Sequence, residues 1–208
     1  MAIALTNLVA ETDRLLDAAR ISDYCPNGLQ VEGRPQVRRI VSGVTASQAL
    51  IDAAIAAEAD VLLVHHGYFW KGEDARVVGS KQRRLKALLA HDISLLAYPL
   101  PLAAHAELGN NVQQAHRLGI EEEDALVPGN PKVIGLQGSL PQPLLAGEFA
   151  ARVEQVLGRA PLLVNPQRRV SRIGWCSGGG QGYIEQAIAA GVDLFLTGEA
   201  SEQTYHSA

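Results

Sequence analysis

The sequence predicts an α/β fold of two similar α/β domains, and three observations support this prediction. Apolar runs of strand length alternate with alanine-rich segments of helical periodicity, which is typical of parallel sheets covered by helices. An acidic run and a Pro-Gly-Asn-Pro turn indicate a boundary, so we expect a first domain at 1–125 and a second at 126–208. The third observation is an internal repeat.

The repeat relates residues 39–66 to residues 172–199 at a constant offset, without a gap. Self-similarity at one offset is a mark of duplicated units. It places Glu199 at the strand end that corresponds to the histidine pair at 65–66. Both halves would therefore present polar groups to a shared cleft.

The first domain is predicted to begin with an amphipathic helix and to continue as strand, helix and strand. A capping box at Thr45–Gln48 and the glycine at position 119 mark helix ends. The expected elements are a helix at 6–20, a turn at 26–28, a strand at 38–44, a helix at 48–58, a strand at 59–64, a helix at 80–90, a strand at 93–98 and a helix at 111–118.

The second domain is predicted from the same signals. Gly158 stops one helix, and a glycine-rich loop at 177–182 opens another. The expected elements are a strand at 132–136, a helix at 144–157, strands at 162–164 and 170–176, a helix reaching residue 190, a strand at 192–196 and a helix from residue 201.

Composition limits the classes of partner. The 208 residues are 47% hydrophobic and 19% charged, with a net charge of −4, so the chain has no basic field for general nucleic-acid binding. No apolar run approaches a membrane span, and the N-terminus lacks a signal-peptide pattern. Two distant cysteines, Cys25 and Cys176, fit a reducing compartment. We expect a cytoplasmic protein without a membrane partner.

Two adjacent histidines, His65 and His66, end the buried aliphatic strand and form the main candidate site. Ligands of open α/β sheets bind outside the carboxyl ends of the strands. Neighbouring strand side chains point to opposite faces, so both imidazoles can reach one ion only if the backbone bends, which Gly67 would permit. Imidazoles suit transition metals. The alternative is one hydrogen-bonded core histidine beside a solvated one.

Other candidate groups carry weaker signals. His105, Glu107 and Glu199 are polar loop residues that could support a site in the cleft. The loop at 178–182 could cradle a phosphate, but it lacks the P-loop lysine, so a tight turn is favoured. The chain has no Gly-x-Ser-x-Gly elbow and no cysteine beside a plausible base. Metal-activated water is therefore the favoured agent of any chemistry.

Several separated motifs resemble the Nif-three-like family, which includes the GTP cyclohydrolase 1 type 2 homologs and the YbgI-like proteins. The motifs are YCPNGLQVEG at 24–33, VHHG at 64–67, LPL at 100–102 followed by His105, Glu107 and GNN at 109–111, and TGE at 197–199. The resemblance covers essentially the whole chain.

This resemblance implies two similar α/β domains that face each other across a cleft with a dinuclear metal site. It also implies a toroidal homohexamer. A complete family member would hold two divalent transition metals per chain, such as zinc, iron, manganese or nickel, and the metals would activate water for hydrolysis. GTP or a related small molecule is the implied substrate.

Carried over residue by residue, the family's paired histidine ligands fall on His65 and His66, and its ligand aspartate falls on Ala103. The family's last two ligands would lie beyond Ala208, so we expect a chain shorter than the family. Metal would then be weak, single or absent unless His105, Glu107, Glu199 or a neighbouring subunit substitutes. The alternative function is a non-catalytic oligomeric scaffold or binding protein.

Overall fold

The computed structural model describes residues 2–130 and 134–208. The chain forms two compact units, Met1–Leu102 and Ala103–Ala208. The predicted boundary between residues 125 and 126 falls inside the second unit. The acidic run forms strand β7 (Glu121–Ala125), which pairs antiparallel with β8 (Leu136–Leu145). Its charges are tolerated because β7 is an edge strand in the described part of the chain, where carboxylates can remain in water.

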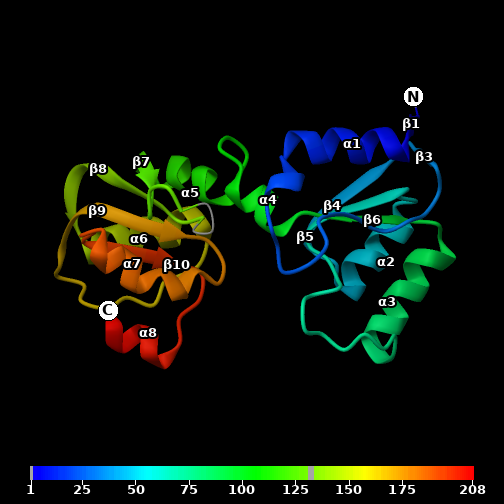
Figure 1. Ribbon diagram of the computed structural model, residues 1–208. Helices are drawn as coiled ribbons and strands as arrows, with labels where there is room; N and C mark the ends of the chain where they lie inside the picture. The colour runs from blue at the N-terminus through cyan, green and yellow to red at the C-terminus, as the bar shows by residue number, and fades with distance from the viewer. Residues whose placement is uncertain (1, 131–133) are drawn as a thin grey trace. The chain divides into compact units, whose positions relative to one another are not determined.

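The first unit is built on a four-stranded sheet in the order β2-β6-β5-β4 (Figure 1). Strands β4, β5 and β6 are parallel, whereas β2 runs antiparallel to β6. The strands are β2 (Gly28–Val31), β4 (Ile40–Thr45), β5 (Val61–His66) and β6 (Ser94–Ala97), and a short ribbon joins β1 (Ile3–Ala4) to β3 (Gln36–Val37). The helices are α1 (Leu5–Leu15), η1 (Ala18–Arg20), α2 (Gln48–Ala56) and α3 (Gly79–Ala90), and α4 (Pro99–Ala104) contains the boundary between the units.

Strand β5 is buried on both faces of this sheet, which explains its unbroken apolar sequence. Leu62 and Val64 belong to a cluster with residues of α2 and α3, whereas Val61 belongs to a second cluster with Leu5 of α1 and Tyr98. Helix α1 is shorter than predicted. Asp17 adopts a left-handed φ of 50°, and a short 3-10 turn follows it.

The second unit contains a four-stranded sheet in the order β10-β9-β8-β7. Its core gathers Phe149, Val170, Ile173 and Trp175. The predicted strand at 162–164 does not form, and the predicted strand at 132–136 begins outside the described residues. The remaining elements are α5 (Asn110–Leu118), α6 (Ala146–Leu157), β9 (Arg169–Cys176), η2 (Gly180–Tyr183), α7 (Ile184–Ala189), β10 (Leu194–Thr197) and α8 (Glu202–Ser207).

The two segments that the predicted repeat relates have corresponding hydrogen bonds in their sheets. Ile40 pairs with Val61 between parallel strands β4 and β5, and the corresponding pair between β9 and β10 is Ile173 with Leu194. Asp60 Oδ2 accepts the backbone N–H groups of residues 38 and 39, and Asp193 Oδ2 accepts those of residues 171 and 172. The two strand–helix–strand segments therefore share both register and turn chemistry.

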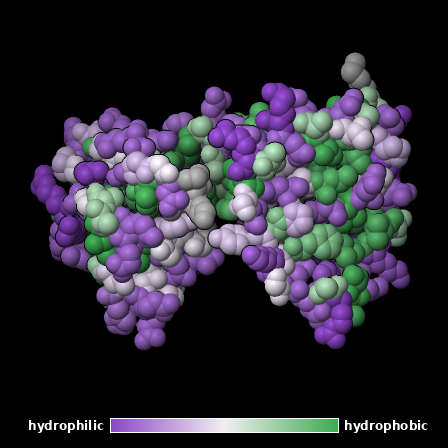
Figure 2. All heavy atoms as spheres, viewed as in Figure 1, coloured by the Kyte–Doolittle hydropathy of each residue, from purple (hydrophilic) through white to green (hydrophobic). Residues whose placement is uncertain are grey.

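Strand β4 leaves apolar side chains in solvent. It is an edge of its sheet in the described part of the chain, and Ile40 and Val44 are exposed. Figure 2 shows hydrophobic surface over the region of β4 and α2. None of the helices among the described residues has the length and apolar character needed to span a membrane.

Candidate functional site

The histidine pair occupies the carboxyl end of β5. The strand continues through His66, which pairs with Thr45 of β4, and the imidazole centroids lie 4.4 Å apart at an interplanar angle of 44°. Gly67 stands directly after the last residue of β5 and does not adopt a positive φ. A Cβ there would lie 2.6 Å from the Ala97 Cβ, so glycine is required by close packing instead.

Gln30, which the sequence patterns did not single out, holds the segment after the histidines. Its Oε1 accepts the Tyr68 N–H at 2.7 Å, and its Nε2 donates to the Tyr68 carbonyl at 3.0 Å. The Tyr68 hydroxyl donates to the Ala46 carbonyl at 2.6 Å, and the Trp70 indole N–H donates to the Gly67 carbonyl at 3.2 Å. The only sequence signal for Gln30 was its position inside the YCPNGLQVEG motif.

Burial and the neighbouring charge of His66 lower the pKa of His65, while a hydrogen bond with the Tyr98 backbone and the negative charge of Asp23 act in the opposite direction. The lowered pKa favours neutral imidazole, the form that binds metals. Asp23 was also missed from the sequence. Its two carboxylate oxygens accept the backbone N–H groups of Tyr24 and Leu100, which orders the chain beside His65.

The supporting residues predicted from the sequence lie in the second unit. His105 Nδ1 accepts the backbone N–H groups of Glu107 and Leu108 at 3.1 and 3.0 Å, which fixes the imidazole against its own loop. Glu107 and Glu199 are exposed. Ala103, at the family's aspartate position, is only 6% exposed.

The described residues supply only some of the ligands that a metal ion needs. Within residues 2–130 and 134–208, no group of three His, Cys, Asp or Glu side chains is close enough to hold an ion. Burial raises the pKa of both Cys25 and Cys176 to about 11, so neither supplies a thiolate at neutral pH. The two imidazoles fit zinc, iron or nickel as part of a site, and further ligands are needed to complete it.

Neighbouring side chains fill the space beside Gly179 and Gly180 of the glycine-rich loop at 178–182. A Cβ on Gly180 would lie 2.5 Å from the Cys176 Cβ, and a Cβ on Gly179 would lie 3.4 Å from a carboxylate oxygen of Glu199. A carboxylate beside the loop repels phosphate, and the α7 helix that follows has only six residues. The tight-turn interpretation is therefore the better one.

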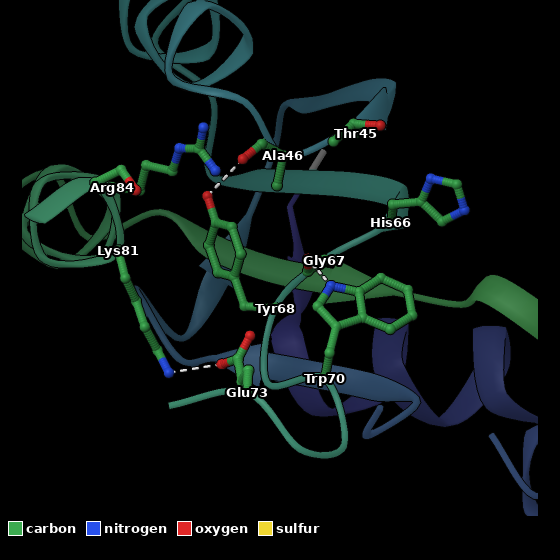
Figure 3. Close-up of a pocket in the computed structure, with 10 residues that line it drawn as sticks. Thr45, Ala46, His66, Gly67, Tyr68, Trp70, Glu73, Lys81 and Arg84 are labelled. Carbon is green, nitrogen blue, oxygen red and sulfur yellow. Dashed lines mark hydrogen bonds and ion pairs between the residues drawn. The ribbon is translucent and has the colours of Figure 1, made fainter. Parts of the chain in front are cut away.

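A cavity of about 480 Å³ lies beside His66 within the first unit (Figure 3). It is walled by the ends of β4 and β5, by the loop after Gly67, and by the first turns of α3. Polar and aromatic side chains dominate its lining, including His66, Trp70, Glu73, Ser80, Lys81 and Arg84. The candidate site therefore combines a histidine pair with an adjacent cavity that charged and aromatic residues line.

Comparison with known proteins gives a family match over nearly the whole chain. The model of the Duf34/NIF3 (NGG1p interacting factor 3) family matches residues 3–208. A protein of Pseudomonas aeruginosa named GTP cyclohydrolase 1 type 2 homolog is 70% identical over 208 residues, which is 100% of this chain and 82% of the relative. A protein of the same name from Vibrio cholerae is 51% identical over 97% of this chain and 81% of the relative.

Solved structures agree with this match. The protein ybgI is 50% identical and superposes with a TM-score of 0.94, covering 99% of this chain and 82% of that one. TTHA1606 from Thermus thermophilus is 35% identical with a TM-score of 0.82, covering 98% of this chain and 81% of that one.

Proposed function

The chain belongs to the Duf34/NIF3 family, and we accordingly propose that it binds a divalent transition metal at His65 and His66 and hydrolyses a nucleotide or related small molecule. The observation that carries the proposal is the convergence of two imidazoles, 4.4 Å apart, at the carboxyl end of a buried parallel strand. The names of the relatives make GTP the first substrate to test.

The chain's own residues would prepare this site. Burial favours the neutral, ligating form of His65, and Gln30 holds the backbone that follows the pair. A metal bound here would supply Lewis acidity and lower the pKa of a bound water. We propose the side chains of His105, Glu107 and Glu199 as supporting ligands.

A second candidate is a non-catalytic oligomeric scaffold or binding protein. The small donor set favours it, since the described residues offer only two converging imidazoles and alanine stands at position 103. Metal affinity depends on ligand number and geometry. The two candidates therefore differ in the amount of metal that the purified chain retains.

Elemental analysis of the purified 208-residue chain, paired with a GTP hydrolysis assay, separates them. The enzyme proposal expects about one ion or more per chain, lost in His65→Ala and retained in His116→Ala, a matched change at an exposed histidine of α5. Less than about a tenth of an ion per chain, with an intact oligomer, would support the scaffold.

We also propose the hexameric assembly implied by the family resemblance. The native mass would then be about six times the chain mass of 22.2 kDa. Light scattering at two protein concentrations measures it, and a concentration-independent mass of 22.2 kDa would refute the assembly.

A further inference from the structure

The cavity beside His66 carries a positive charge that the described residues do not neutralise. Arg84 of α3 lines it and has no carboxylate within ion-pair distance in the described part of the chain. Its Nε atom is buried and has no acceptor among the described residues. An unsatisfied buried N–H costs stability, and the guanidinium charge of Arg84 also lacks a counter-ion among the residues that the structure describes, which an anionic ligand in the cavity would supply.

The second cation of the cavity is partly neutralised. Lys81 Nζ lies 2.6 Å from a Glu73 carboxylate oxygen and 5.4 Å from the centre of the Phe69 ring. The ammonium group is thus held in place, with its side chain 19% exposed. Among the charged residues that line the cavity, two cations face one carboxylate, so the lining has a net positive charge.

The third contribution is the start of helix α3, a helix of 12 residues. Ser80 and Lys81, in its first turn, line the cavity, and the N-cap residue Val78 provides no side-chain cap. The first N–H groups of a helix bind anions, and phosphate groups in particular. This helix start therefore reinforces the charge of Arg84.

The aromatic wall of the cavity is formed by Trp70, which is held by a hydrogen bond and a ring contact. The Trp70 indole N–H donates to the Gly67 carbonyl, and the indole meets the His66 ring edge-on with centroids 5.8 Å apart. Figure 3 shows Trp70 beside His66, while Lys81 and Arg84 extend from α3 on the other side of Tyr68. A flat indole at one end and cations at the other suit a ligand with a planar ring and an anionic tail.

We propose that this cavity binds a phosphate-bearing small molecule with a planar ring, with the phosphate at Arg84, Lys81 and the start of α3 and the ring toward Trp70. This binding site belongs to the proposed function and rests on it for the identity of the reaction. The binding of the ligand does not depend on that reaction. The proposed site makes Arg84 a substrate-binding residue and places the ligand's ring toward the histidine pair.

The test measures binding of GTP, inorganic tripolyphosphate and guanosine to the full chain in EDTA by tryptophan fluorescence. Trp70 reports on the cavity, whereas Trp175 is fully buried in the second unit and serves as a constant background. Trp70→Phe should remove the response. Isothermal titration calorimetry provides a second measurement that does not depend on either tryptophan.

We expect Arg84→Gln to weaken GTP and tripolyphosphate binding about tenfold or more while guanosine binding changes little. The matched control is Arg83→Gln, since Arg83 is an exposed neighbour on the same helix that does not line the cavity. Arg84→Lys, which keeps the charge but not the planar fork, should give an intermediate affinity.

Equal GTP affinity in Arg84→Gln and Arg83→Gln would overturn the proposal, as would the absence of GTP binding to the unsubstituted chain at about 1 mM. If Arg84→Gln does not fold, failure of tripolyphosphate to compete with GTP on the unsubstituted chain would also overturn it. His65 does not line the cavity, so His65→Ala should lose metal and keep GTP binding in EDTA. Failure of this inference is thereby distinguishable from failure of the proposed metal site.

Discussion

At the residue scale, the most instructive side chain is the aspartate that precedes β5 in the repeat. Asp60 is 6% exposed and accepts hydrogen bonds from the backbone of residues 38 and 39 and from the Arg34 guanidinium. Burial alone would raise its pKa, but these hydrogen bonds and the charge of Arg34 outweigh burial and lower it. Asp193 accepts the backbone N–H groups of residues 171 and 172, and its side chain is more exposed than that of Asp60.

Replacing Asp60 with asparagine should lower the free energy of unfolding by about 2–4 kcal/mol, because asparagine cannot accept all three hydrogen bonds. Asp193→Asn should lower the free energy of unfolding by a smaller amount. Since the folded-state pKa of Asp60 is lowered, its stabilisation is present above about pH 4 and is lost as the pH falls further. Urea unfolding at several pH values measures both effects, and a constant Asp60→Asn difference down to about pH 2 would contradict this account.

At the element scale, the end of β5 depends on its neighbours more than on its own sequence. The strand ends where Gln30 of β2 hydrogen-bonds the backbone of Tyr68, and where β6 brings Ala97 against Gly67. Strand β2 was absent from the predicted elements, since the glycine that begins it was read as part of a turn. The histidine pair is thus positioned by two strands that are distant from it in sequence.

Gly67→Ala should destabilise the first unit by about 1–3 kcal/mol, because the added methyl group overlaps Ala97 and the Gln30 amide. The Trp70 indole N–H resonance should shift, since its acceptor is the Gly67 carbonyl. Gly182→Ala is the matched control, because a Cβ there meets nothing within 4 Å. Thermal unfolding and NMR measure these changes. Equal stability of the two variants would argue against the packing explanation.

At the scale of the whole molecule, each unit has its own hydrophobic core. The two clusters of the first unit and the cluster of the second share no residue. The second unit is further held by Asn111, which is 1% exposed. Its side chain accepts the Ser177 N–H and donates to the Ile134 carbonyl, while its own carbonyl accepts the Trp175 indole N–H.

Asn111→Ala should therefore loosen the second unit selectively, by about 1–3 kcal/mol, because it leaves two partly buried backbone groups without partners. Hydrogen exchange should accelerate in β9 and α5 while β5 and β6 remain protected. Arg117→Ala, at an exposed position of α5, should leave both patterns unchanged. Equal acceleration in β5 and β9 would mean that the two units unfold together.

The α/β class, the repeat and the histidine pair could be read from the sequence alone, because they depend on local periodicity and on residue order. Contacts formed on folding account for the rest. The acidic run becomes an edge strand because it pairs with β8. Position 67 requires glycine because the Ala97 side chain approaches its backbone closely. Such contacts also gather Trp70, Lys81 and Arg84 around one cavity. These outcomes depend on residues far apart in the chain, and local sequence patterns do not encode such contacts.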